Sequence, residues 1–165
     1  MTSGPARAWI IRASDSGMQT QVLSRPAIAV GWSIHRDVSH VRTQEEMVRL
    51  FASMPRNDTP QSQANKAGQL YTFLRFVEIG DIVLTPLKRT RTVRVGTING
   101  PYEFESERFT FGFEHPHLRK VHWVSEIARD VLSSGLIQRL NMQPTVIPVH
   151  EHIAEISRYA VRGTR

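Results

Sequence analysis

Cysteine is absent from this chain of 165 residues, which excludes disulfide bonds, thiolate metal sites and cysteine nucleophiles. The sequence also lacks a signal-peptide pattern and any long apolar run. We therefore expect a cytoplasmic protein without a membrane partner. Its length and its 40% content of hydrophobic residues fit one domain with a single core.

Lysine is scarce, with 3 residues against 18 arginines, yet the net charge is +6. The planar guanidinium of arginine pairs bidentately with phosphate or with a guanine edge, which lysine cannot do. A genome rich in G and C would also favour arginine codons, so the ratio alone assigns no function. The net charge favours an anionic partner independently of that ratio.

Hydrophobic periodicity and capping residues divide the chain into short strands and helices. Thr43 followed by Glu46 is typical of a capping box, and Thr59 before Pro60 is typical of a second helix start. The pattern predicts strands at about 9–11, 27–32, 81–87, 92–98, 121–127 and 145–149, a further short strand at 102–104, and helices at about 43–54, 61–77, 131–140 and 153–159. This order predicts an α+β fold in which a small barrel of five or six strands is flanked by two or three helices. We expect residues 8–150 to form the domain and residues 151–165 to form a terminal helix or tail.

Catalytic motifs are missing from the sequence. A common nuclease arrangement needs a carboxylate pair with a lysine two places after the second acid, and none of the three lysines has an acid at that position. The residues two before Lys66, Lys88 and Lys120 are Ala64, Pro86 and Leu118. No nucleophile elbow and no glycine-rich phosphate or dinucleotide loop is present either. We predict no catalytic residue and no cofactor.

Two His-x-His pairs provide the strongest argument for an enzyme. His115 and His117 form one pair, and His150 and His152 form the other. Two imidazoles at this spacing on a strand face the same side and could hold zinc. A zinc site needs three or four ligands, however, so we predict no metal site and keep a metal-dependent hydrolase as the alternative function.

The order and spacing of several segments resemble a known family. The segments are Ala8–Arg12, Val30–Trp32, Asn65 with Gly68–Leu70, Gly80–Asp81, Gly96–Tyr102 and His117-x-Arg119-x-Val121-x-Trp123. Together they are similar to the amino-terminal domain of Mrr-type restriction endonucleases, a branch of the PUA-like superfamily that includes the EVE and YTH domains. The resemblance runs from Trp9 to about Leu140 and implies a PUA-like barrel that reads nucleic acid.

The same resemblance implies a pocket for a base that has been rotated out of its stack. Such a pocket needs flat aromatic walls, which Trp9, Trp32 and Trp123 could supply, although each tryptophan could instead pack in the core. Asn65 and Gln69 lie four residues apart on one helical face, where their amides could bond a base edge or tie the helix to a neighbouring strand. We predict that Trp32, Trp9, Asn65, Gln69 and Trp123 form the base pocket.

A cluster of cations lies in the hairpin between the strands at 81–87 and 92–98. It consists of Lys88, Arg89, Arg91 and Arg94. Hairpin ends project from a barrel, and a lysine or arginine on a phosphate releases counterions, so we predict that this cluster binds phosphate. A solvated turn would also carry charge, though seldom of one sign.

The resemblance implies a non-catalytic module that recognises a modified base in DNA by flipping it into the pocket. In bacterial restriction or defence such a module delivers a nuclease effector, fused or separate, to double-stranded DNA with modified bases. No effector domain is present in this sequence. A small-ligand or protein-interaction module on the same barrel is a further alternative to the hydrolase.

Overall fold

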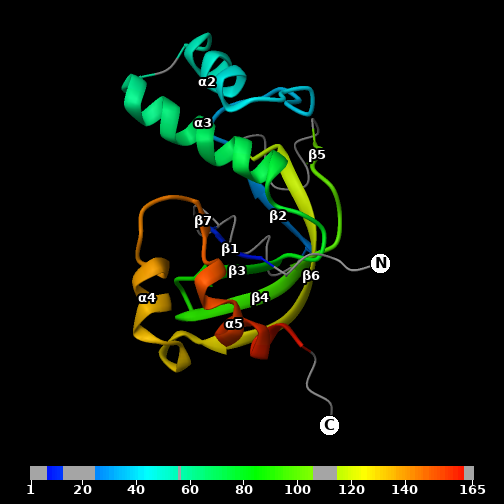
Figure 1. Ribbon diagram of the computed structural model, residues 1–165, viewed down its shortest axis with the longest axis vertical. Helices are drawn as coiled ribbons and strands as arrows, with labels where there is room; N and C mark the ends of the chain where they lie inside the picture. The colour runs from blue at the N-terminus through cyan, green and yellow to red at the C-terminus, as the bar shows by residue number, and fades with distance from the viewer. Residues whose placement is uncertain (1–6, 13–24, 56, 106–114, 162–165) are drawn as a thin grey trace. The chain divides into compact units, whose positions relative to one another are not determined.

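The computed structural model describes residues 7–12, 25–55, 57–105 and 115–161 (Figure 1). Its contacts divide the chain into two compact units. The first unit consists of Met1–Ile28, Glu78–Pro101 and Arg119–Arg165, and the second of Ala29–Val77 and Tyr102–Leu118. Among the described residues, no helix is both long enough and apolar enough to cross a membrane.

The described elements follow one another in an order close to the predicted one. They are β1 (Ala8–Ile11), β2 (Ala27–Val30), α2 (Gln44–Ala52), α3 (Pro60–Arg75), β3 (Ile82–Leu87), β4 (Thr92–Ile98), β5 (Glu103–Phe104), β6 (His117–Ala128), the 3-10 turn η1 (Arg129–Val131), α4 (Ser134–Leu140), β7 (Val146–Pro148), the 3-10 turn η2 (His150–His152) and α5 (Ile153–Ala160). The α+β class is therefore confirmed, with seven strands and four α-helices in the part of the chain described here.

The strands of the first unit lie in the order β6-β4-β3-β1-β7, and the start of β2 continues the sheet beside β6. β1 runs parallel to β3 and antiparallel to β7, so it is paired on both edges. Every residue of β1 and of β3 is buried. Such short, continuously apolar runs are typical of strands that are covered on both faces.

The core of the first unit lies between this sheet and the carboxyl-terminal helices. Leu136 and Leu140 of α4 and Ile156 of α5 are buried with strand residues such as Leu84 and Val95. Three further residues of α5 pack against the same cluster, namely Ile153, Tyr159 and Ala160. The helix predicted near the carboxyl end thus contributes residues to the core of the first unit.

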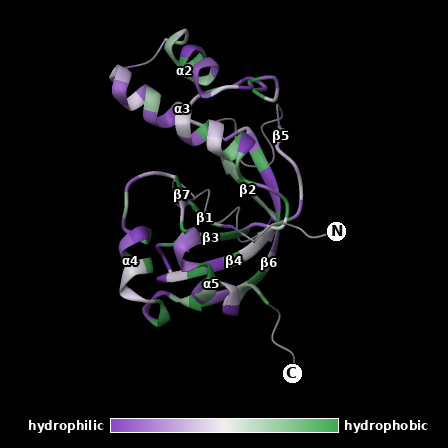
Figure 2. Ribbon diagram, in the orientation of Figure 1, coloured by the Kyte–Doolittle hydropathy of each residue, from purple (hydrophilic) through white to green (hydrophobic). Residues whose placement is uncertain are grey.

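The second unit contains the helix pair α2 and α3, and both helices begin as predicted. The Thr43 hydroxyl accepts a hydrogen bond from the Glu46 N–H at 3.1 Å, and the Thr59 hydroxyl accepts one from the Ser62 N–H at 3.1 Å. Each helix carries both hydrophobic and hydrophilic residues (Figure 2). The apolar residues are buried, namely Met47 and Phe51 in α2 and Ala67, Leu70, Phe73 and Leu74 in α3.

β2 ends at Val30, two residues before its predicted end, and two other elements differ more from their predicted bounds. β6 begins at His117 rather than near residue 121, because its first two residues pair with β5 before the strand continues beside β4. The single helix predicted at 131–140 is divided into η1 and α4. Ser133 separates the two by capping α4, since its hydroxyl accepts from the Leu136 N–H.

Candidate nucleic-acid interface

Trp32 lies in a strained tight turn directly after β2. The Ile34 N–H donates to the Gly31 carbonyl at 3.1 Å, and both central residues have positive φ, 52° at Trp32 and 62° at Ser33. Positive φ at both central positions is typical of type I′ turns, which favour Asn and Gly. A non-glycine residue held in this region costs about 1–3 kcal/mol and is found most often at binding and active sites. The Trp32 side chain is half-buried here.

The same turn borders a hollow of about 470 Å³ in the second unit. Its lining residues are Ser33, Pro55, Asn57, Asp58 and Lys66. The volume falls within the range of roughly 300–1,000 Å³ that small-molecule sites occupy. The lining offers a hydroxyl, an amide, a carboxylate and an ammonium group, and the ammonium and carboxylate groups form an ion pair at 2.9 Å.

Asn65 and Gln69 belong to the helix that contributes Lys66 to this hollow. Asn65 is exposed, and Gln69 is half-buried one turn further along α3. Neither residue lines the hollow itself. Their contact with a base therefore stays a prediction.

A buried histidine fastens the segment that follows the Trp32 turn. His117 is fully buried, and its Nε2 lies 2.7 Å from the Ile34 carbonyl, so Nε2 must carry the proton. Its Nδ1 lies 2.8 Å from the Tyr102 hydroxyl, which therefore donates to it. The Tyr102 oxygen in turn accepts from the Val38 N–H at 3.3 Å.

This arrangement keeps the imidazole neutral. Burial lowers the pKa of His117 to about 4, although the Ile34 carbonyl and Asp37 act in the opposite direction. Burial also raises the pKa of the Tyr102 hydroxyl, which stays protonated. The sequence indicated His117 as half of a histidine pair and as part of one segment of the family resemblance. Its hydrogen bond to the segment after Trp32 could not be predicted, because it depends on tertiary contacts.

Trp9 and Trp123 lie in the first unit and have partners there. Trp9 is 3% exposed, its Nε1–H donates to Asp81 at 2.8 Å, and its ring meets His150 edge-on at 4.7 Å. Trp123 is half-buried on β6, and its Nε1–H donates to the Arg25 carbonyl at 3.1 Å. The burial of Trp9 matches the packing alternative raised for it from the sequence.

The predicted phosphate cluster divides into two parts. Lys88, Arg89 and Arg91 are exposed in the turn between β3 and β4, where the hairpin was expected. Arg94 lies within β4, ion-paired to Glu126 at 3.5 Å, and its guanidinium lies 5.7 Å from the centre of the Trp123 ring. The end of the hairpin therefore carries three of the four cations.

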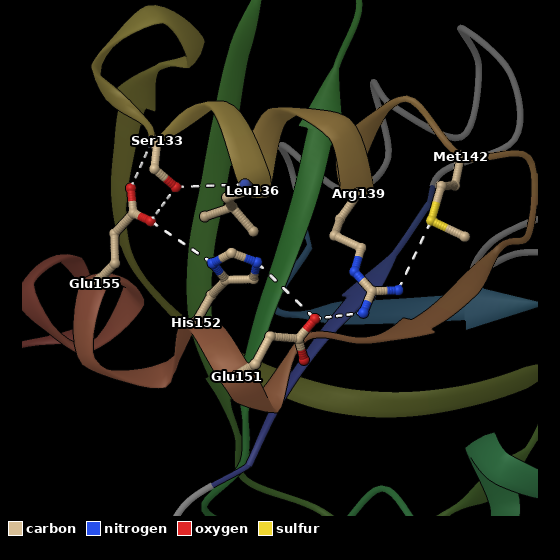
Figure 3. A network of polar contacts seen from close by, with 7 residues as sticks. All are labelled: Ser133, Leu136, Arg139, Met142, Glu151, His152 and Glu155. Carbon is tan, nitrogen blue, oxygen red and sulfur yellow. Dashed lines mark hydrogen bonds and ion pairs between the residues drawn. The ribbon is translucent and has the colours of Figure 1, made fainter.

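Both residues of the second histidine pair contact groups of the first unit, and Figure 3 shows the contacts of His152. The His150 Nδ1 accepts from the Ala8 N–H at 3.2 Å. His152 lies 3.9 Å from the carboxylates of both Glu151 and Glu155, and Glu155 accepts bonds from the Ser133 N–H and hydroxyl. Within the described ranges, no group of three or more His, Cys, Asp or Glu residues is arranged to hold a metal ion.

The chain has an α+β fold. Its second unit carries the tryptophan turn that borders the polar hollow, and its first unit carries the cationic hairpin. The chain belongs to the family described as Domain of unknown function (DUF8426), whose model matches residues 9–149. The matched range includes every residue predicted for the base pocket and the phosphate cluster. No curated protein sequence matches the chain.

Several solved structures are similar to the chain at low identity. The YTH domain of Zygosaccharomyces rouxii MRB1, in complex with N6-methyladenosine RNA, is 11% identical with a TM-score of 0.48, covering 98% of this chain and 93% of that one. The Mmi1 YTH domain is 9% identical with a TM-score of 0.49, covering 95% and 76%. Atu2648 from Agrobacterium tumefaciens is 12% identical with a TM-score of 0.38, covering 93% and 92%. At these scores the similarities carry no inference about function.

Proposed function

We propose that this domain is a non-catalytic nucleic-acid-binding module that recognises a modified base held against Trp32. The observation that carries the proposal is the type I′ turn, in which two non-glycine residues adopt positive φ beside a polar hollow. Such strain persists only where the surrounding structure enforces it, and the His117 ties supply that enforcement. The net charge of +6 supports a polyanionic partner.

The groups around the hollow suit a base that has left its stack. Trp32 itself does not line the hollow; its indole, on the residue before Ser33, would replace the lost stacking at about 1–3 kcal/mol per base. The Ser33 hydroxyl and the Asn57 amide provide donors and acceptors for the base edge. A methyl group on the base would bury its apolar area against Trp32 and Pro55, worth about 0.8 kcal/mol or nearly fourfold in affinity.

The resemblance to Mrr-type domains extends the proposal to its partner. It favours double-stranded DNA with modified bases over RNA, and a nuclease effector, fused or separate, within a bacterial defence system. The hydrolase alternative has no comparable support, because His150 and His152 each contact groups inside the first unit.

The test is a binding panel of plain, methylated and hydroxymethylated duplexes, with matching single-stranded RNA and 2-aminopurine at the target position. We expect Trp32→Ala to remove discrimination for the modified base, at a cost of about 1–3 kcal/mol in affinity. The 2-aminopurine fluorescence of the wild-type complex should rise, because the target base leaves the stack.

Phe76→Ala is the matched control, since Phe76 is an aromatic residue of the same unit with 46% of its surface exposed. It should leave discrimination unchanged. A folded Trp32→Ala variant that still prefers the modified duplex would contradict the proposal. Preference for the RNA would replace DNA by RNA as the proposed partner and leave the base pocket unchanged. Cleavage of DNA in the presence of magnesium or manganese would contradict the non-catalytic assignment.

A further inference from the structure

A second hollow, of about 560 Å³, lies in the first unit at the end of the β3–β4 hairpin. Its lining residues are Leu87, Lys88, Arg91, Arg129, Asp130, Ile137 and Asn141. The lining therefore contains three cations and one carboxylate. Lys88 and Arg91 come from the hairpin turn, and Arg129 comes from η1. Arg129 and Asn141 were not among the cations and amides that the sequence indicated.

Arg129 is fixed in place before any ligand arrives. Its guanidinium donates to the Asn141 side-chain oxygen, and its backbone N–H donates to the Arg91 carbonyl at 3.2 Å. Arg91 has a φ of 54°, which sets the close of the turn. Side chains ordered in advance lose less entropy when they bind, which raises affinity for an anion.

The three cations that line this hollow exceed the single negative charge of Asp130. Arg12 adds a fourth positive charge that interacts with Arg129; its guanidinium is half-buried and donates to the Pro144 carbonyl at 3.0 Å. Burial, together with the charge of Arg129, lowers the pKa of Arg12. The ion pairs found among the described residues involve neither Arg91 nor Arg129. A bound anion would relieve this repulsion.

We propose that the hollow binds a backbone phosphodiester of the nucleic acid, with Lys88, Arg91 and Arg129 as its contacts. The inference rests on the proposed function and identifies the residues that would contact the backbone of the bound nucleic acid. The two guanidinium groups present planar forks that match phosphate oxygens. Asn141 is a positioning residue, because it contacts Arg129 and orients its fork.

The experiment compares Arg91→Ala and Arg129→Ala with Arg7→Ala in duplex titrations across a range of salt concentrations. Arg7 is the matched control, since it is an exposed arginine of the same unit that neither lines the hollow nor belongs to the predicted phosphate cluster. Each of the first two variants should flatten the slope of log K against log salt by about 0.9, the value for one lost phosphate contact. Arg7→Ala should leave the slope unchanged.

Two further arms make the result specific. Arg129→Lys should retain the slope but bind more weakly, because it keeps the charge and loses the fork. A duplex with a 5′-phosphate and one without it should respond equally to Arg129→Ala. If Arg129→Ala changed the slope only for the duplex with a 5′-phosphate, the hollow would bind a terminal phosphomonoester. That result would overturn the assignment to a phosphodiester.

The two proposals fail in different ways. A wild-type chain that binds duplex, combined with an Arg129→Ala variant of unchanged slope, would overturn the phosphate site and leave the base pocket standing. A wild-type chain that binds no nucleic acid would overturn both. Equal slope changes in all three alanine variants would show that the net positive charge attracts the duplex diffusely, and would overturn the phosphate site.

Discussion

A neutral imidazole joins β6 to the segment that follows the tryptophan turn. The Nε2–H of His117 donates to the Ile34 carbonyl, and its Nδ1 accepts a hydrogen bond from the Tyr102 hydroxyl. Protonating Nδ1 would remove the acceptor of the Tyr102 hydrogen bond, so the hydroxyl would have to reorient, and it would place a positive charge in a buried site. The fold therefore favours the neutral imidazole, which is lost in acid.

The stability of the protein should consequently fall as the pH is lowered. The folded pKa of His117, about 4, lies below its ordinary value of 6.5. The stabilisation is present above pH 6.5 and is lost progressively as the pH falls toward 4, because the unfolded chain binds the proton first. The difference corresponds to about 3 kcal/mol in the free energy of unfolding.

Urea denaturation between pH 7.5 and 4 measures this loss. His117→Gln keeps a donor and an acceptor without titrating in this range, so its own pH profile should be flatter than that of the wild type. Parallel profiles for the two proteins would assign the acid sensitivity to other groups.

The local sequence pattern could not decide which tryptophan packs in the core and which lies in a turn. Trp9 and Trp32 both adjoin short apolar strands in the sequence, yet only the structure shows that Asp81 takes the indole N–H of Trp9 and that Trp32 sits at positive φ. Arg129 was missed for a similar reason. Its position beside Lys88 and Arg91 arises from pairing between β4 and β6, which sequence spacing does not encode.

At the scale of elements, β4 and β6 approach unusually closely at Gly96. The pairing register shifts between Val95 and Gly96, opposite Trp123. A Cβ atom at Gly96 would lie 2.6 Å from the Val121 Cγ1, 2.7 Å from the His122 carbonyl oxygen and 2.8 Å from the Trp123 Cε3. Only a glycine fits between these three atoms without displacing the backbone.

Gly96→Ala should therefore destabilise the protein by about 1–3 kcal/mol, as overpacking of a filled core does. Thermal melts of this variant and of Thr97→Ala provide the measurement, since Thr97 is the adjacent β4 residue and is only half-buried. A melting temperature of Gly96→Ala equal to that of Thr97→Ala would show that the strands can separate at no cost.

The helices α2 and α3 were the most predictable elements, because the residues that cap their starts lie next to them in the sequence. Thr43 with Glu46, and Thr59 with Pro60, lie within a few residues of the helices that they begin. The start of β6 was not predictable in this way. It depends on pairing with Phe104 and its neighbour in β5, which are distant in the chain.

At the scale of the whole molecule, charge should dominate binding to unmodified duplex. Three phosphate contacts give a slope of about −2.7, so affinity should fall about 40-fold between 50 and 200 mM salt. Fluorescence anisotropy with a labelled plain duplex measures the change. An equal osmolality of a non-ionic solute is the control and should leave the affinity unaltered. A change of less than a few fold would mean that the net charge of +6 contributes little to binding.

The placement of β1 has a consequence for how the chain reaches its native state. β1 pairs with β3 on one edge and with β7 on the other, so the first described strand meets the last one. During synthesis its apolar residues emerge early and lack their second partner until nearly the whole matched range has left the ribosome. Pairings of such long sequence separation slow folding and leave a strand edge open to other chains in the meantime. A strand that is fully buried and paired on both edges in the native sheet is therefore open to pairing with other chains until β7 has been synthesised.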